Sequence, residues 1–256
     1  MIHKTAIVDP NAELGKEVTV GPYSIIGPKV KIGANTRIDS HVIIKGPTEI
    51  GERCTIFPFA SIGDIPQDLK FKGGETKLII GNDNIIREYV TINRGTEEGG
   101  GVTVIGDHNF FMAYAHIAHD CIINNHVIMA NGATLAGHIE IEDHAIIGGL
   151  VAIHQFVKIG RNSFIGGCSA VPQDVPPFCL AVGNRARLYG LNLTGLKRNN
   201  FTNQTIKRLK DAYRILFRSG LTLNEAIKQI QQKITDSPEV NHLIEFIKKS
   251  KRGILR

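Results

Sequence analysis

The segment AHIAHDC, at residues 115–121, carries the side chains best suited to acid–base chemistry. Asp120 directly follows His119, and His116 lies three residues before His119. An imidazole can accept a proton near neutral pH, and a neighbouring carboxylate can fix its tautomer and stabilise its cation. The spacing alone leaves three hypotheses open: a general base, half of a metal site with His116, or polar surface residues.

An aliphatic or aromatic residue recurs every six positions in 26 units that run from Ile2 to Val171. This period is typical of short strands and turns stacked as a parallel β-helix. Three units make one 18-residue coil, and neighbouring coils would lie ~4.8 Å apart. The register lapses over residues 63–79 and 93–104, which we expect to be loops that project from the coils. The second of these, with EEGGGV, lacks the lysine of a phosphate-binding loop and is expected to be a flexible connection.

An 18-residue coil brings distant histidines together. One set has a spacing of 18 and predicts a surface column at a corner of the prism: His108, His126 and His144. A second set falls within five residues of one another around the coil, beside Asp120: His116, His119, His138 and His154. This cluster favours proton transfer over a zinc site or a scattered surface set. Direct transfer is expected, because the chain has no G-x-S-x-G nucleophile.

The period stops after Pro177, and apolar spacings of three and four then predict helices capped at Thr202, Thr222 and Ser237. We expect a β-helix domain over 1–186 and a helical domain over 187–256. Residues 185–256 hold 16 Lys and Arg against 5 Asp and Glu, whereas the preceding residues hold 14 against 19. Such a basic region indicates either an acidic partner or a solvated helical face.

Further features of the sequence bound the compartment. The chain has no run of 18 apolar residues, and its N-terminus lacks the pattern of a secretory signal. The four cysteines are scattered, which favours a reducing environment over a disulfide framework or a zinc ribbon. We therefore expect a cytoplasmic protein with neither an integral membrane segment nor a nucleic-acid partner.

Several motifs together resemble the UDP-N-acetylglucosamine O-acyltransferase family of hexapeptide-repeat enzymes: AHIAHDC, NGATLAGH, AIIGG with HQF, GGCSAVPQDVPP and GLKR. The resemblance extends along essentially the whole chain. It implies a mainly β fold, a left-handed parallel β-helix with a C-terminal α-helical domain, and a homotrimer with active sites between subunits. It also implies transfer of a 3-hydroxyacyl chain from acyl carrier protein to a UDP-sugar, the first step of lipid A biosynthesis. No metal or other cofactor is implied.

The resemblance assigns roles to particular residues. His119 would be the general base, Asp120 would orient it, and the Gly137 N–H would hold the developing oxyanion. Residues resembling the acceptor, acyl and donor contacts are Asp68, Lys70, His116 and His138. Residues resembling the nucleotide-sugar contacts are His154, Gln155, Asn192 and Arg198. Gly167 matches a position that limits acyl length, and a glycine there implies a long chain.

Three positions depart from the family pattern. Asn93 and Arg185 stand where histidine is common, and Thr194 stands where glutamate is common. These departures leave open a 3-amino sugar acceptor, which would give an amide product. The sequence is also compatible with an acetyltransferase that uses coenzyme A, a metal-dependent hydratase and a binding scaffold without catalysis.

Overall fold

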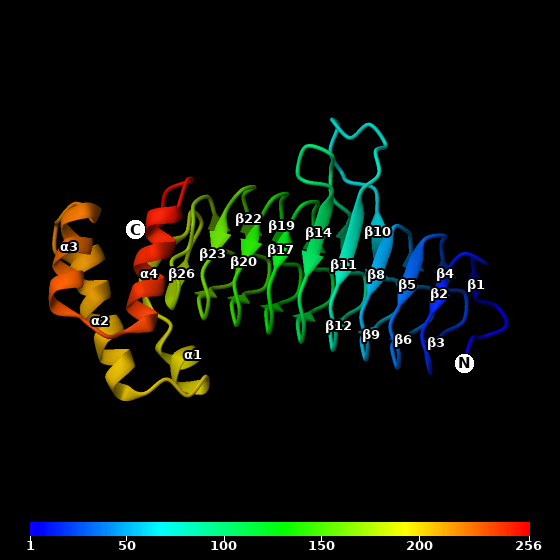
Figure 1. Ribbon diagram of the computed structural model, residues 1–256, viewed down its shortest axis with the longest axis horizontal. Coiled ribbons are helices and arrows are strands. Elements are labelled where there is room, and N and C mark those ends of the chain that lie inside the picture. Colours follow the sequence, from blue (N-terminus) through cyan, green and yellow to red (C-terminus); the bar gives the residue numbers. More distant parts are fainter.

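The computed structural model describes residues 1–256, with a long prism of stacked coils followed by four helices (Figure 1). Two neighbouring loops project from one edge of the prism, between β10 (Ser61–Asp64) and β11 (Lys77–Ile80) and between β13 (Thr91–Asn93) and β14 (Val102–Ile105). They fall within the two lapses of the repeat. The predicted parallel β-helix with C-terminal helices is confirmed.

Each face of the prism is a parallel sheet whose strands come from successive coils. The first face holds β10 and β13 together with β1 (Ile7–Val8), β4 (Ile25–Ile26), β7 (Ile43–Ile44), β16 (His116–Ile117), β19 (Thr134–Leu135), β22 (Ala152–Ile153) and β25 (Ala170–Val171). The second face holds β11 and β14 together with β2 (Glu13–Leu14), β5 (Val30–Ile32), β8 (Thr48–Ile50), β17 (Ile122–Ile123), β20 (Glu140–Ile141) and β23 (Lys158–Ile159). The third face holds β3 (Thr19–Val20), β6 (Arg37–Ile38), β9 (Thr55–Ile56), β12 (Ile85–Ile86), β15 (Phe110–Phe111), β18 (Ile128–Met129), β21 (Ile146–Ile147), β24 (Phe164–Ile165), β26 (Cys179–Val182) and, antiparallel at its end, β27 (Arg187–Leu191).

The hexad residues fill the interior of the prism. From Val20 to Val171 every one of them is at most 4% exposed, and Ile62, Ile92 and Ile117 show the in-register stacking. Burying such a side chain typically contributes about 1.5–3 kcal/mol. Ile2 is exposed and Val8 and Leu14 are half-buried, because no coil covers that end of the prism.

The three corners differ in the side chains they present. Most turns contain a non-glycine residue with φ between +54° and +67°, a conformation that His, Asn and Asp adopt more readily than other side chains. The loop corner, between the first and second faces, bears both loops and Asp120, His138 and Phe156. The histidine corner follows the second face and bears His108, His126 and His144. The aromatic corner follows the third face and stacks Tyr23, His41, Phe59, Tyr89 and Tyr114.

The predicted histidine column is confirmed. The centroids of the His108 and His126 rings lie 4.9 Å apart, and those of His126 and His144 lie 4.7 Å apart, with the rings nearly parallel. Burial and the neighbouring His126 hold the pKa of His144 below its ordinary value. Folded His144 therefore resists protonation.

The lowered pKa of His144 predicts that the stability of the protein depends on pH. Because the unfolded chain binds protons that folded His144 refuses, the free energy of unfolding should fall as the pH drops from about 7.5 to about 5.5, around the ordinary histidine pKa. Urea unfolding across that range measures the slope. His144→Asn should make the slope shallower, and an unaltered slope in this variant contradicts this account.

The helical domain consists of α1 (Leu193–Arg198), α2 (Asn203–Arg218), α3 (Leu223–Lys233) and α4 (Pro238–Lys249) around its own core of 14 buried residues. Thr202 and Thr222 accept hydrogen bonds from the backbone of their helices, so both predicted caps are confirmed. Pro238 begins α4 after Ser237, as expected, although the Ser237 hydroxyl makes no capping bond. The expected boundary between 186 and 187 falls in the turn of the β26–β27 hairpin. No helix combines the length and apolar character that crossing a membrane requires.

Candidate functional site

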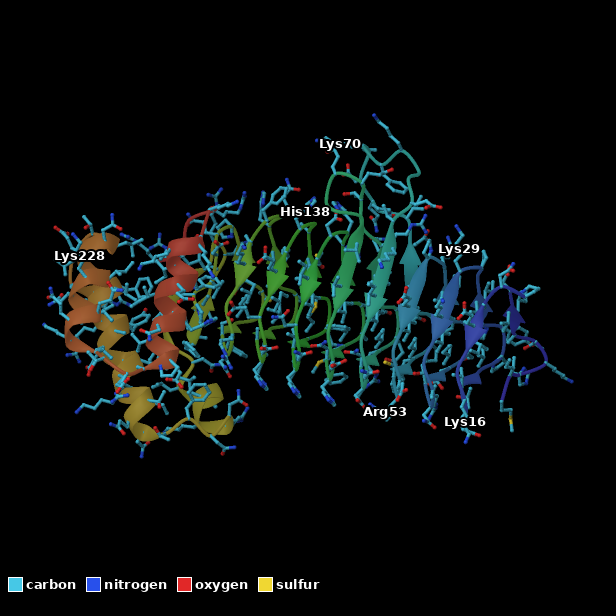
Figure 2. The ribbon with its side chains drawn as sticks, viewed as in Figure 1. Lys16, Lys29, Arg53, Lys70, His138 and Lys228 are labelled. Carbon is cyan, nitrogen blue, oxygen red and sulfur yellow. The ribbon has the colours of Figure 1, made fainter.

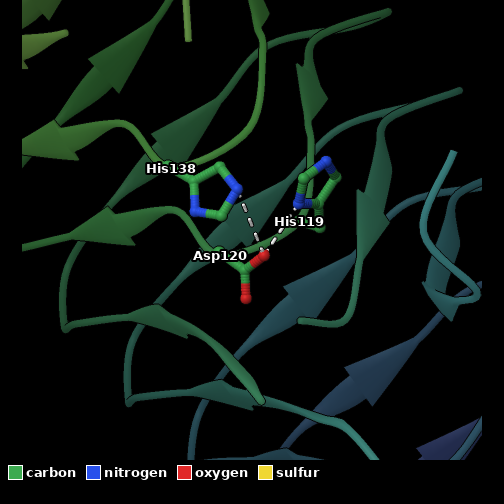
Figure 3. A group of neighbouring side chains, drawn as sticks. All are labelled: His119, Asp120 and His138. Atoms are coloured by element: carbon green, nitrogen blue, oxygen red, sulfur yellow. Dashed lines mark hydrogen bonds and ion pairs between the residues drawn. The ribbon is translucent and has the colours of Figure 1, made fainter. Parts of the chain in front are cut away.

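The His119–Asp120 pair lies at the loop corner, directly after β16. The Nδ1 atom of His119 is 2.8 Å from Oδ2 of Asp120 (Figure 3). Both side chains are almost completely buried, with exposed fractions of 11% and 1%. Because a carboxylate accepts and does not donate, the proton of the neutral imidazole lies on Nδ1 and the lone pair on Nε2. His119 is therefore arranged to accept a proton at Nε2.

The second projecting loop holds Asp120 in place. The Thr96 N–H donates to Oδ1 of Asp120 at 2.9 Å, and the Thr96 hydroxyl donates to Oδ2 at 2.6 Å. The Asp120 N–H donates to the Thr103 hydroxyl at 2.8 Å, and a Cβ at Gly99 would collide with the carboxylate. We expected only a flexible connection here, and that expectation was wrong about the loop's role. No hexad register extends through the loop, so counting could not align Thr96 with Asp120.

His138, one coil further on, completes a group of three. Its Nε2 lies 3.7 Å from Oδ2 of Asp120, and its ring meets that of His119 edge-on at 5.0 Å. Burial and the neighbouring His119 lower the pKa of His138, whereas Asp120 opposes that shift. The ligand-type atoms of the three residues lie within 4.8 Å of one another, so the group also satisfies a loose criterion for a metal site.

A cleft of about 820 Å³ opens beside this group, between the loops and the coils. Its wall includes Asp68 and Lys70 from the first loop and Gln155 from the coil after His138. Figure 2 shows Lys70 and His138 at the same edge of the prism, opposite the edge with Lys16 and Arg53. The structure thus brings His119, His138, Asp68, Lys70 and Gln155 together.

Two of the four clustered histidines do not line the cleft. His116 lies in strand β16, where Nδ1 is 2.7 Å from the Thr91 hydroxyl, and burial together with His119 lowers its pKa. His154 lies two coils beyond His119 along the loop corner and contacts Arg252. Counting placed both histidines near the site, but successive positions on a coil point in different directions.

Three other predicted residues lie away from the cleft. Asn192 caps α1 and donates from Nδ2 to the carbonyl of Asn162, at the histidine corner, so Arg198 at the end of the same helix is on that side too. Figure 1 shows α1 at the edge opposite the two loops. Gly167 lies at the aromatic corner between β24 and β25. Within one subunit, these residues do not meet His119.

Gly137 lies directly against the imidazole of His119. A Cβ at Gly137 would come 2.5 Å from Cε1 and 2.7 Å from Nε2 of His119, so any larger residue must displace the ring. We expect Gly137→Ala to lower kcat by roughly 100-fold or more, since such misplacement disrupts the reacting geometry. Steady-state rates measure the loss of kcat, and thermal unfolding shows whether the substitution also destabilises the fold. Gly27→Ala, where the nearest atom to a Cβ would be the Ile44 carbonyl oxygen at 3.3 Å, should keep full activity, and equal rates in the two variants contradict the prediction.

Comparisons with known proteins agree along the whole chain. The family described as "Udp N-acetylglucosamine O-acyltransferase; Domain 2" matches residues 174–255, and the bacterial transferase hexapeptide family matches residues 29–64 and 102–137. An acyl-[acyl-carrier-protein]--UDP-N-acetylglucosamine O-acyltransferase from Thermodesulfovibrio yellowstonii is 62% identical over 255 residues, covering 100% of this chain and 99% of the relative. The chain belongs to the UDP-N-acetylglucosamine O-acyltransferase family.

Solved structures of the O-acyltransferase family have the same architecture. LpxA from Acinetobacter baumannii is 49% identical with a TM-score of 0.97, and the comparison covers 100% of this chain and 99% of that one. LpxA from Bacteroides fragilis is 40% identical with a TM-score of 0.98, and both chains are covered completely. Membership confirms the resemblance seen in the sequence and the predicted left-handed parallel β-helix with C-terminal helices.

One departure from the family pattern has a visible setting. Asn93, at the end of β13, is buried, and its Nδ2 donates to the carbonyl of Ile65 at the start of the first loop. Its Oδ1 is buried without a hydrogen-bond partner. Asn93 therefore fastens the base of the loop that carries Asp68 and Lys70.

Proposed function

We propose that this protein transfers a 3-hydroxyacyl chain from acyl carrier protein to the 3-hydroxyl of UDP-N-acetylglucosamine, the first step of lipid A biosynthesis. The observation that carries the proposal is the buried His119–Asp120 pair at the edge of an open cleft. The names of the relatives specify an O-acyl product from the same donor and acceptor. That wording favours the hydroxyl over a 3-amino group.

The reaction follows from the tautomer of His119. The sugar 3-hydroxyl oxygen attacks the thioester carbonyl while its proton moves to Nε2 of His119. The imidazolium that forms is stabilised by Asp120 at 2.8 Å. As the C–S bond breaks, the proton passes from Nε2 to the departing thiolate. The products are the 3-O-acyl sugar nucleotide and the free thiol of the carrier, and no covalent enzyme intermediate forms.

The remaining residues of the cleft are assigned supporting roles. The N–H of Gly137 has no hydrogen-bond partner within the chain and lies beside the His119 ring, so it is available to the developing oxyanion. One such donor contributes roughly 3–4 kcal/mol in other enzymes. Asp68 and Lys70 line the cleft from the first loop and would contact the sugar and the acyl chain. The family resemblance assigns His116 to the same pocket. His138 would lie nearest the donor. No metal or other cofactor takes part in these steps.

Two of the proposed nucleotide contacts, Asn192 and Arg198, require a second subunit. Asn192 and Arg198 lie at the histidine corner, away from His119, so they reach a cleft only if a neighbouring copy presents them. The aromatic corner supports such packing, since Tyr23 and Tyr114 are 61% and 63% exposed within one ladder of stacked rings. We therefore propose a homotrimer in which each cleft lies between subunits, with Gln155 from one wall and α1 from the other.

The charge of the helical domain supports acyl carrier protein as the partner, and the chemistry of the donor and of the cysteines supports the cytoplasm as the compartment. Acyl carrier protein is acidic, which suits the excess of Lys and Arg in residues 185–256. The thioester donor and the four free cysteines are consistent with the cytoplasm. The family resemblance assigns Gly167 to the limit on acyl length, and the absence of a side chain there suits a long acyl chain.

One experiment separates the candidate functions. A mixture of 3-hydroxyacyl carrier proteins is incubated with UDP-N-acetylglucosamine and its 3-amino analogue. A parallel reaction uses acyl-coenzyme A as the donor, and mass spectrometry identifies the products of both. We expect an ester of a long 3-hydroxyacyl chain from the carrier. An amide as the only product would overturn the proposal in favour of an N-acyltransferase. A product formed only from acyl-coenzyme A would favour an acetyltransferase, and the absence of turnover would favour a binding scaffold. Zinc analysis of the same preparation tests the hydratase, and sedimentation equilibrium tests the trimer.

A further inference from the structure

The end of the chain turns back from α4 onto the final coil of the prism. The N–H of Asp174 donates to the carbonyl of Gly253 at 2.9 Å, and the N–H of Leu255 donates to the carbonyl of Asp174 at 2.9 Å. Asp174 and Ile254 thus form a parallel bridge. The C-terminal tail, residues 250–256, is held in strand-like register against the prism.

A buried carboxylate fixes the start of this tail. Asp174 is fully buried, and its Oδ2 accepts a 2.6 Å hydrogen bond from the Ser250 hydroxyl. Its Oδ1 accepts a 2.8 Å hydrogen bond from the N–H of Lys158. Two specific bonds in a buried setting limit the tail to one position, since an unpaired carboxylate there would be costly.

The tail forms one wall of a groove that continues from the catalytic group. A second cavity, of about 520 Å³, is lined by Lys251 and Arg252 at one end and by Asp120 and His138 at the other. Gly99, His138 and Phe156 line both this cavity and the cleft beside His119, so the two adjoin each other. The cations of the tail therefore share a cavity with Asp120 and His138 of the catalytic group.

Arg252 makes two directed contacts there. Its Nε donates to the carbonyl of Pro172 at 3.1 Å, and its Nη2 lies 2.8 Å from Nδ1 of His154. A guanidinium can only donate hydrogen bonds, so Nδ1 of His154 must present its lone pair and the ring proton must lie on Nε2. The carbonyl of Gln155, 3.2 Å from the same Nδ1, would require the opposite tautomer. The shorter, charge-assisted bond decides between them.

We propose that Arg252 is a positioning residue that fixes His154 as the Nε2–H tautomer, so that His154 donates a hydrogen bond to an anionic oxygen of the nucleotide diphosphate. This proposal rests on the proposed function for the identity of the substrate. Without Arg252, the Gln155 carbonyl draws the proton to Nδ1. Nε2 then carries a lone pair, which repels a phosphate oxygen. The C-terminal tail thus prepares the site for the acceptor and leaves the proton transfer at His119 unchanged.

The tautomer can be measured in the resting protein, which separates this proposal from the proposed function. Nitrogen-15 NMR of the full chain, with the His154 signals assigned by their loss in His154→Gln, should show a protonated Nε2 and an unprotonated Nδ1. Arg252→Met should move the proton to Nδ1, and Arg252→Lys, which keeps a cationic donor, should restore the original pattern in part. A protonated Nδ1 in the unaltered protein overturns the proposal whatever the enzyme's substrate.

Kinetics supply a second readout. Arg252→Met should raise KM for UDP-N-acetylglucosamine about tenfold, the effect of one charge-assisted hydrogen bond, with kcat nearly unchanged. Lys16→Met, which removes an exposed charge near the N-terminal end of the prism, should match the unaltered protein. In a His154→Ala background, Arg252→Met should have no further effect on KM. An equal rise in that background would mean that Arg252 acts independently of His154 and would overturn the proposal.

Discussion

His119→Ala is expected to lower kcat by roughly 100- to 10,000-fold, the usual contribution of a positioned general base. The variant removes the nitrogen that we assign as acceptor of the sugar proton, while the hydrogen bonds from Thr96 still hold Asp120. The KM for each substrate and the melting temperature should change little, because the ring contributes to the chemistry more than to the packing. Turnover of a 3-hydroxyacyl carrier protein with UDP-N-acetylglucosamine measures the loss.

The histidine corner supplies the matched control for this variant. His126→Ala removes an imidazole from the same type of coil, in a stack that faces away from the cleft, and should retain full activity. If His119→Ala kept more than about a tenth of the original rate, the assignment of His119 would be rejected. Such a loss would be smaller than the loss that removal of a general base normally causes.

Asp120→Asn should come close to the same loss, by inverting the tautomer of His119. The Thr96 N–H faces Oδ1 and cannot accept, so the amide oxygen of asparagine must take that place. The amide nitrogen then occupies the place of Oδ2, where it donates to Nδ1 of His119 and forces the proton onto Nε2. A ring protonated at Nε2 cannot act as the base, and comparable changes in other enzymes cost up to roughly 10,000-fold in kcat.

Steady-state rates and circular dichroism of Asp120→Asn test this argument. Asp143→Asn is the control, because Asp143 accepts a backbone hydrogen bond from Asn125 and the equivalent place one coil earlier already holds an asparagine, Asn125. We expect the control to be fully active. A nearly active Asp120→Asn would mean that the negative charge and the tautomer of the pair are dispensable.

The hexad period was enough to predict the stacked coils and the approach of His119 to His138. Once the coil length was 18, His119 and His138 had to meet across neighbouring coils, and the edge-on contact of their rings is the result. The same counting predicted the stacked column at the histidine corner. These inferences succeeded because a regular repeat converts distance along the chain into position around the prism.

The remaining parts of the site lie where the repeat is interrupted. The support that Thr96 and Gly99 give to Asp120 comes from a loop whose path no period determines. Helix α1 has only 6 residues, too few to show a periodic apolar face, and the β26–β27 hairpin departs from the parallel order. The contact of Arg252 with His154 joins residues 98 apart through a tail with no sequence pattern. Such contacts depend on tertiary packing and could be found only in the structure.

The uniform coil also limits how this enzyme can evolve. Inserting or deleting a single amino acid between His119 and His138 would rotate every downstream side chain around the prism, moving isoleucines outward and charges inward. Length can change freely only where the chain already leaves the coil. Changes in substrate preference in such a scaffold should therefore be concentrated in the two projecting loops and the C-terminal tail, while the coils between them stay constant in length.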